Sequence, residues 1–355
     1  MKRLFKIIGI VLLVIILAAA ALIGVLSLTE YKPAETETVE LTGEGSRTLS
    51  AGDSFSLLTW NTGYAGLSKT ADFFMDGGKG VKTQDKASVQ NNIAAFEKLL
   101  TQEDADIVFL QETDRNSSRS YGIDQYEQIG EALSGTQRCF ANNFKVLFIP
   151  YPVPPIGKVD SGIATYSKFA ASEAVRVRLP NPFSWPIRMA NLKRCLLVTR
   201  IPVEGTDKEL VLINLHLEAY DEGEGKIAQT KMLAELMQSE YEKGNYVIAA
   251  GDFNQSFSGT DTSMYPVQGP ELWQCGLLDE EQFGDGWQFL MDTSHPTCRS
   301  LDRAYDPDDE TFQYYMIDGC IVSANIEVES LETVDLGFEN SDHNPVRLRA
   351  VLKDF

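Results

Sequence analysis

Two polar side chains stand at the end of one apolar segment, at a spacing that could support chemistry. The stretch AAGDFNQ completes the apolar run YVIAA and places Asp252 and Asn254 on either side of Phe253. In an extended chain, residues two apart point to the same side. The carboxylate and the carboxamide would therefore converge on one point, while Phe253 packs the other way. That point is either a simple Asx turn or a reaction centre, depending on what else converges on it.

Other apolar segments also carry a polar residue at or near their ends. The further members of the set are Asn61 in TWN, Glu112 in LQE, His216 in NLHLE, Asp318 in MID, and Asp342 with His343 in SDH. Each motif alone has an ordinary explanation, such as a turn, an exposed charge or a buried sheet histidine. Two of the three histidines of the chain nevertheless belong to this set. We therefore interpret these residues as one shared site.

The segments that must position these residues indicate an α/β sandwich. Helices are expected at residues 86–101 and 226–242, and strands at 54–61, 106–112, 161–167, 174–179, 194–201, 209–220, 246–250, 314–323 and 344–352. Many strands with few long helices predict mostly antiparallel sheets with the helices outside. In the strand at 174–179, alternation predicts Val175 and Val177 facing inward and Arg176 and Arg178 facing outward.

The order of the motifs resembles the endonuclease/exonuclease/phosphatase family. TWN, LQE, SGIATYS, NLHLE, GDFN, MID and SDH follow one another in the family's order between about Phe55 and Leu352. The resemblance implies a four-layer α/β sandwich of two packed sheets flanked by helices, with the site at one edge of the sheets. It also implies hydrolysis of a phosphate ester, because the family includes deoxyribonucleases, abasic-site endonucleases, inositol polyphosphate phosphatases and neutral sphingomyelinases.

The resemblance and the side-chain chemistry together suggest a metal site. A hard divalent cation such as Mg²⁺ (or Mn²⁺) prefers oxygen ligands and keeps several waters. Glu112 is the expected direct ligand. Asn61 and Asp342 are expected near the ion, directly or through water.

The remaining motif residues are expected to carry the catalytic roles. Asp252 would align or deprotonate the attacking water, and Asn254 would bond the phosphate or the developing anion. His343, oriented by Asp318, and His216 would face the scissile phosphate from two sides. Which histidine acts as acid and which as base stays open.

The first residues differ from the rest of the chain. After the basic start MKRLFK, residues 7–28 form an apolar, uncharged run of about 22 residues, long enough to cross a bilayer. Small residues at Ala18–Ala21 leave a cleaved signal peptide, and hence a secreted protein, as the alternative. Because the run continues beyond these alanines, we favour a transmembrane anchor (1–28), a tether (29–53) with an edge strand near Val39–Leu41, and a catalytic domain (54–355) outside the cytoplasm.

Charge and composition bear on the substrate. The net charge of −20 disfavours a high-affinity, non-specific nucleic-acid binder. Two acid-free stretches, Phe140–Val159 and Ala174–Val203, nevertheless combine bases with aromatic residues, and Arg188 and Trp185 are the substrate-binding candidates. A lipid-facing rim would suit a phospholipid or sphingomyelin phosphodiesterase. The alternatives are an extracellular nuclease and a non-catalytic surface-binding protein on the same fold.

The five cysteines predict no zinc site, because there is no CxxC pair. Cys195 and Cys320 lie in apolar runs and are expected as buried thiols. Cys275 and Cys298 could pair outside the cell, which the spacing alone does not decide.

The apolar run and the bases before it lead to a prediction about topology. The protein should stay in the membrane fraction, and external protease should degrade the catalytic domain in intact cells. Cell fractionation and protease protection measure both properties. A mature soluble protein that begins between Ala19 and Leu22 would establish the signal-peptide alternative instead.

Overall fold

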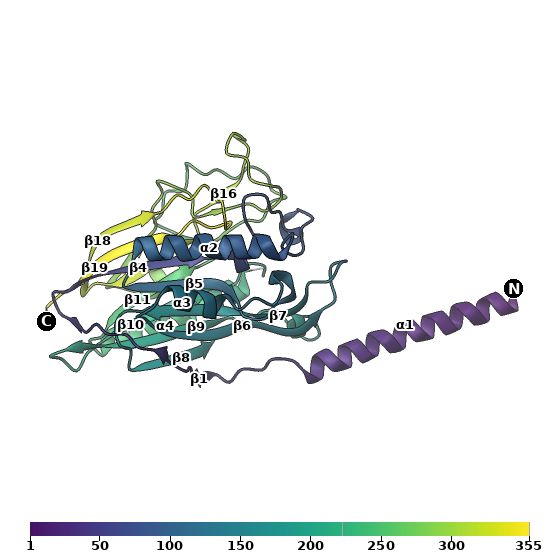
Figure 1. Cartoon of the computed structure of the whole chain (residues 1–355), viewed down its shortest axis with the longest axis horizontal. Coiled ribbons are helices and arrows are strands. Elements are labelled where there is room, and N and C mark those ends of the chain that lie inside the picture. Colours follow the sequence, from purple (N-terminus) through teal and green to yellow (C-terminus); the bar gives the residue numbers. More distant parts are fainter. Residues whose placement is uncertain (222, 355) are drawn as a thin grey trace.

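The computed structural model describes residues 1–221 and 223–354, so residue 222 and residue 355, the last of the expected catalytic domain, lie outside the description. Two large sheets pack face to face, helices cover their outer faces, and α1 (Lys2–Leu28) projects away from the domain (Figure 1). This arrangement confirms the predicted α/β sandwich. Among the described residues, α1 is the one helix long and apolar enough to cross a membrane, and a signal sequence has the same properties.

The first sheet has the strand order β1-β8-β9-β10-β11-β17-β14, with β3 beside β9. Its strands are β1 (Thr36–Thr38), β3 (Leu49–Ser50), β8 (Glu173–Arg178), β9 (Cys195–Glu204), β10 (Glu209–His216), β11 (Tyr246–Asp252), β14 (Trp287–Leu290) and β17 (Asp318–Ser323). Its neighbours are antiparallel except for β10 with β11 and β3 with β9. β9 and β10, which follow each other in the chain, form a hairpin.

The second sheet has the order β18-β19-β4-β5-β7-β6-β2. Its strands are β2 (Thr42–Gly43), β4 (Ser54–Asn61), β5 (Ile107–Asp114), β6 (Gln137–Ile149), β7 (Gly157–Ser167), β18 (Ile326–Thr333) and β19 (Val346–Leu352). Only β4 and β5 run parallel in this sheet. Two short pairs lie outside both sheets, β12 (Gln255–Phe257) with β13 (Gly276–Leu278), and β15 (Cys298–Arg299) with β16 (Tyr314–Tyr315).

The central strands of both sheets are largely apolar because both faces of each sheet are buried there. Leu57 and Ile107 of the second sheet pack against Leu212 of the first in the core between the sheets. Their chain neighbours point outward and pack under helices. Helix α2 (Lys86–Glu103) and α3 (Gln125–Ala132) cover the second sheet, and α4 (Glu224–Glu242) covers the first. Val89, Ile93, Phe96 and Leu100, spaced as on one face of a helix, form the buried face of α2.

Two β-α-β units bring four strand ends to one edge. Helix α2 connects parallel strands β4 and β5, and α4 connects parallel strands β10 and β11. The carboxyl ends of parallel strands lie at the same edge of a sheet. In this sandwich the two edges coincide, since Asn61 at the end of β4 contacts Asp252 at the end of β11.

Residues 29–53, expected as a tether, contribute strands to both sheets. β1 pairs with β8, β2 pairs with β6, and β3 pairs with β9. Val39 and Leu41, expected as an edge strand, lie between β1 and β2 and pack against a buried cluster that includes Cys139 and Leu197. The polar composition hid β1 and β2 because their pairing uses the backbone and leaves most of their side chains in solvent, whereas Leu49 of β3 is buried in the core.

The prediction that Arg176 faces outward is wrong, whereas Arg178 is exposed as predicted. Arg176 is buried, and its guanidinium donates to the Asn142 carbonyl (3.0 Å) and the Lys193 carbonyl (2.7 Å). Val177 faces the other side and packs against the cluster under α4. The reason is a bulge of β6 between Asn142 and Phe144, which frees a carbonyl for a long side chain to reach.

The cysteines are all within the described residues and are free thiols. Cys195 and Cys320 are buried, as predicted. Cys275 packs against the cluster that contains Cys298, without a disulfide between them.

The buried position of Arg176 leads to a stability prediction. Arg176→Ala should lower the free energy of unfolding by about 2–4 kcal/mol, because it leaves buried carbonyls without their donor. Arg178→Ala is the matched control on the same strand. Arg178 is exposed and pairs with Glu35, so its loss should cost less than about 1 kcal/mol. Urea unfolding of the full chain in detergent measures both, and equal losses would contradict the buried orientation.

Candidate active site

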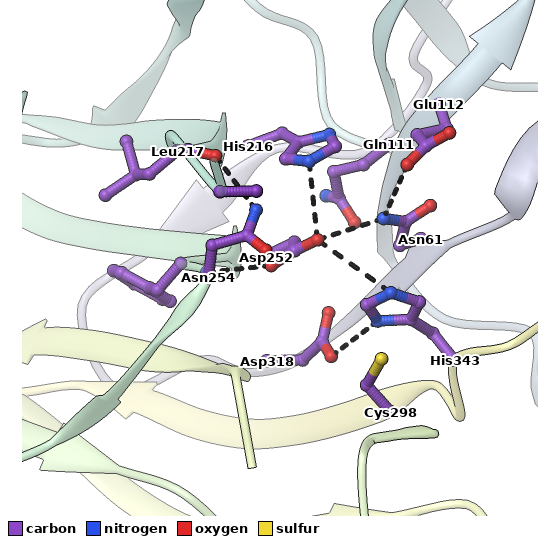
Figure 2. A network of polar contacts seen from close by, with 12 residues as sticks. Asn61, Gln111, Glu112, His216, Leu217, Asp252, Asn254, Cys298, Asp318 and His343 are labelled. Atoms are coloured by element: carbon purple, nitrogen blue, oxygen red, sulfur yellow. Dashed lines mark hydrogen bonds and ion pairs between the residues drawn. The ribbon is translucent and has the colours of Figure 1, made fainter. Parts of the chain in front are cut away.

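The polar residues of the site continue the inner faces of the two sheets. Asn61 lies four residues after Leu57 and His216 four residues after Leu212, so alternation keeps them on the core side of their strands. The strand register then aligns Asp252 with His216 on one side and with Asp318 on the other. Figure 2 shows these side chains meeting where the core ends.

Asp252 is the hub of the network. Its Oδ2 lies 3.0 Å from Asn61 Nδ2, 3.4 Å from His216 Nε2 and 3.9 Å from His343 Nε2 (Figure 2). Burial, and then the charge of Asp318, raise the pKa of Asp252 to about 7, although His343 acts in the opposite direction. Near neutral pH this carboxylate is therefore poised to take up a proton.

Asn254 is part of a turn and of the site at once. Its backbone N–H donates to Asp252 Oδ1 (2.8 Å), and its Nδ2 donates to the Leu217 carbonyl (2.9 Å). The residue has a left-handed φ of 51°, a costly conformation of the kind that clusters at functional sites. Phe253 packs away from the site against Phe257. GDFN therefore forms an Asx turn and at the same time places Asp252 in the polar network.

The two histidines have opposite electrostatic environments. His343 Nδ1 lies 2.8 Å from Asp318 Oδ2, and Trp60 Nε1 donates to the His343 carbonyl. Burial lowers the pKa of His343, but Asp318 and neighbouring acidic groups outweigh it and raise the pKa well above its ordinary value. Burial and Arg194 lower the pKa of His216 well below its ordinary value. His343 is therefore an imidazolium and His216 a neutral imidazole.

Glu112 reaches the site through a bulge. The pairing of β5 with β7 shifts between Leu110 and Thr113, and Glu112 has a φ of 53°. The bulge breaks the alternation, so that Glu112 Oε1 lies 3.3 Å from Asn61 Nδ2 although the chain neighbour Gln111 also faces inward. Arg119 Nη1 lies 3.9 Å from the other carboxylate oxygen of Glu112.

The acidic residues suit a divalent cation. Burial raises the pKa of Asp342 to about 6, and the charge of Glu112 adds to the effect despite His343. A cation between these two carboxylates would relieve that repulsion. Gly63 leaves room beside them, since a Cβ on Gly63 would lie 2.8 Å from Asp342 Oδ1. Asn61 turns its Nδ2 toward Glu112 and its Oδ1 toward the Gly63 N–H, so a direct contact through Oδ1 requires the carboxamide to turn over.

Two other groups of side chains in the described residues have metal-like spacing. They are Cys298 with Asp342 and His343, and Asp252 with Asp318 and His343. Burial raises the pKa of the Cys298 thiol to about 12, which makes it a poor ligand for a hard cation. His343 is already hydrogen-bonded to Asp318. Glu112 belongs to neither group, so its role as the metal ligand stays a prediction, supported by the effect of its charge on Asp342.

The network opens into a cavity of about 600 Å³. Its lining includes the polar residues Glu112, Asn254, Asp342 and both site histidines, with Asp252. Apolar and aromatic side chains also line it, among them Phe74, Phe144, Ile149, Tyr151 and Phe183. The cavity can thus accommodate a molecule that has both a charged group and an apolar group.

The two substrate-binding candidates do not line this cavity. Arg188 pairs with Glu30 (3.1 Å), and Trp185 Nε1 donates to Ser27 Oγ (3.2 Å) at the end of α1. Their neighbour Arg194 is buried, where it pairs with Glu218. Local composition could not show that nearby acids neutralise these bases.

Sequence reasoning missed Arg119 and Asn143, which do line the cavity. Arg119 stacks on the ring of Tyr64 (3.7 Å) and pairs with Asp114 (2.9 Å). Asn143 Nδ2 is buried without a hydrogen-bond partner among the described residues. A basic residue seven positions after Glu112, in RNSSRSY, was the available signal for Arg119, whereas Asn143 had none.

The fold and this constellation define a hydrolase of phosphate esters. The family model described as Endonuclease/Exonuclease/phosphatase matches residues 58–343, and the chain belongs to this family. The members of the family generally use divalent metals, and the acidic residues above provide a place for one. A search of curated protein sequences finds no match.

Solved structures share the fold at low sequence identity. An endonuclease/exonuclease/phosphatase from Beutenbergia cavernae is 18% identical with a TM-score of 0.59, over 84% of this chain and 72% of that chain. TDP2 from Caenorhabditis elegans is 14% identical with a TM-score of 0.53, over 85% and 75%. ANGEL2, a 2',3'-cyclic phosphatase, is 14% identical with a TM-score of 0.54, over 90% and 99%. These likenesses extend across the sandwich and show its fold.

The carboxylate pair leads to a prediction about metal binding. Saturating Mg²⁺ should stabilise the protein by about 2.7 kcal/mol at one hundred times the dissociation constant, or roughly 5 °C in Tm. Folding raises the pKa of Asp342 to about 6, so protonation of this carboxyl group stabilises the metal-free folded protein. That contribution to the free energy of unfolding is lost as the pH rises from about 4 to about 6. The metal needs the ionised form, so the gain in Tm should be larger at about pH 8 than at about pH 5.

The matched variants are Glu112→Gln and Glu339→Gln. The first should lose most of the Mg²⁺-induced rise in Tm. The second removes a surface acid that pairs with Lys69, so its rise should equal that of the wild type. Thermal melts with and without Mg²⁺ decide the matter, and an undiminished rise in Glu112→Gln would contradict this ligand.

Proposed function

We propose that the protein is a metal-dependent phosphodiesterase, held in the membrane by α1 with its catalytic domain outside the cytoplasm, and that it acts on a lipid phosphate ester of the phospholipid or sphingomyelin type. The observation that carries the proposal is the chemistry of the cavity. Its lining combines acidic and imidazole groups with apolar and aromatic side chains. An amphiphilic phosphodiester combines the same two kinds of group.

Glu112 and Asp342, with Asn61 beside them, would hold Mg²⁺ or Mn²⁺. The bound ion would neutralise charge on the phosphate oxygens. Arg119 adds a fixed positive charge next to Glu112. These groups would orient the phosphate toward Asp252.

Asp252 would align the attacking water and accept its proton. Its raised pKa matches this role, because a base works best when its pKa lies near the working pH. The hydrogen bonds from Asn61 and from the Asn254 backbone hold the carboxylate in one orientation. Its side chain could then turn only at the cost of breaking both.

The histidines would bind the phosphoryl group from two sides. The His343 imidazolium, fixed by Asp318, offers its Nε2 proton to a phosphoryl oxygen, where negative charge increases during reaction. Neutral His216 lies on the other side of Asp252, 3.4 Å from its Oδ2. Asn254 lines the cavity and would bond the same phosphate.

The bases of the acid-free stretch 174–203 are paired with acids, which favours a lipid over a nucleic acid as the substrate. Arg188 and Lys193 are paired with Glu30, and Arg194 with Glu218. A nucleic-acid backbone needs several free cations to replace its counterions, and the net charge of the chain is −20. The aromatic cavity walls instead suit an apolar chain.

The proposal predicts loss of activity in two variants of the full-length protein. Asp252→Asn and His343→Ala should each lower kcat for a phospholipid diester at least about 100-fold, because each removes one proton-handling or charge-stabilising group. His295→Ala is the matched control, since His295 lies in an exposed loop beside Asp335 and outside the cavity.

The assay offers a phospholipid diester, sphingomyelin, a soluble diester, a monoester and single-stranded DNA side by side, with Mg²⁺. Hydrolysis of DNA alone, falling steeply with salt, would replace the lipid proposal by the nuclease alternative. Wild-type rates in both variants would contradict the site.

A further inference from the structure

Apolar side chains are exposed on the last three residues of β6 and on the connection from β6 to β7, a segment that we call the 147–156 loop. Leu147, Phe148, Tyr151 and Val153 are 51%, 39%, 68% and 92% exposed. The loop contains no charged residue, whereas the chain as a whole carries a net charge of −20. Apolar side chains clustered on a surface mark a site of interaction with a protein or a membrane.

The end of α1 is seated beside this loop. Leu22 and Leu26 of α1 share one apolar cluster with Val146 and Ile149 at the end of β6. Figure 1 shows the β6–β7 end of the second sheet on the side of the domain from which α1 leaves. The contacts of α1 therefore fix where the loop lies relative to the membrane that would hold the helix.

The length of α1 places these contacts at the bilayer boundary. Lys6 is the last charged residue of the helix, and a span needs about 20 apolar residues. Counted from Ile7, such a span reaches Leu26, one of the two residues that contact the domain. The neighbouring loop is thus level with the outer surface of the bilayer.

The same loop also forms part of the cavity wall. Ile149, Tyr151 and Ile156 line the cavity that also carries Asp252 and His343. The Tyr151 ring contacts the ring of Phe74, another lining residue, with ring centroids 5.8 Å apart. One side of the loop therefore meets the cavity and the other side is exposed next to α1.

We propose that the 147–156 loop docks in the outer leaflet of the bilayer that holds α1, and that the cavity takes its substrate, a phosphate ester with an apolar chain, from that same bilayer. Docking removes Leu147, Phe148 and Val153 from water and brings the cavity mouth to the lipid headgroups. The chemistry of the substrate rests on the proposed function, whereas the docking does not. Two measurements separate them.

The first measurement tests docking without any reaction. The full chain, with Cys275→Ser to remove the half-buried thiol, carries Val153→Cys with an environment-sensitive fluorophore and is reconstituted in phosphatidylcholine liposomes. Lipids spin-labelled near the headgroup should quench this probe at least about twofold. A probe at Asp207→Cys, in the β9–β10 turn at the opposite end of the first sheet from His216, should stay unquenched. Equal quenching at both positions, or none at Val153, would overturn the docking.

The second measurement tests delivery from the shared bilayer. Leu147→Glu with Val153→Glu changes two side chains that do not line the cavity. It should lower hydrolysis of a phospholipid in the same liposome roughly tenfold, because two apolar side chains that would be buried in the bilayer are replaced by charged ones. Hydrolysis of a soluble diester should be unchanged. The double variant Leu277→Glu with Val267→Glu, at exposed apolar positions outside the loop, is the matched control and should behave as wild type.

The outcomes are distinguishable. Undiminished lipid hydrolysis in the loop variant, or equal loss on the soluble diester, would overturn delivery through the loop. Wild-type protein that hydrolyses no phosphate ester would remove the proposed function, and the fluorescence measurement would still decide the docking.

Discussion

A buried amide pair joins the two sheets by hydrogen bonds at the point where the apolar core gives way to the site. Gln111 Nε2 of β5 donates to Asn214 Oδ1 of β10 (2.8 Å), and Asn214 Nδ2 donates to the Ala164 carbonyl of β7 (2.8 Å). Apolar packing alone tolerates small sliding of one sheet on the other, but buried amides lose their partners if they slide. These two bonds therefore hold the relative position of Glu112, next to Gln111, and His216, two residues after Asn214. The contact between Asn61 and Asp252 across the two sheets depends on the same alignment.

Within that frame the site concentrates charges that destabilise the fold locally. Burial raises the pKa values of Asp252 and Asp342, so each ionised carboxylate costs stability near neutral pH. The positive charge of His343 offsets part of this cost, and a bound cation would offset more. Perturbed carboxylates and histidines with opposite pKa shifts in one cavity are the usual mark of acid–base chemistry rather than of a binding surface. This arrangement is the physical argument against the non-catalytic alternative.

The contacts between α1 and the domain fix the orientation of the cavity relative to this helix. A helix linked only by a flexible tether would leave the cavity free to face any way. Here Leu22 and Leu26 pack against β6, while β1, β2 and β3 bind the following residues to both sheets. Ion pairs of Glu30 with Arg188 and Lys193 lie between these two attachments. The bases that suggested a phosphate-binding rim in the sequence therefore serve to seat the helix.

The sequence by itself determined the sandwich, the two main helices and most strands, because apolar periodicity is a local property that survives in the folded state. It also singled out Asn61, His216 and Asp252, since a polar residue ending an apolar strand stays on the face that alternation assigns to it. Asp318 and His343 were singled out by the order of their motifs. Tertiary structure decided what depends on the partner of a segment. The bulge that turns Glu112 inward arises from pairing with β7, and the bulge of β6 buries Arg176. Arg188 lies outside the cavity, where it pairs with Glu30. Such pairings join residues far apart in the chain, so no local pattern encodes them.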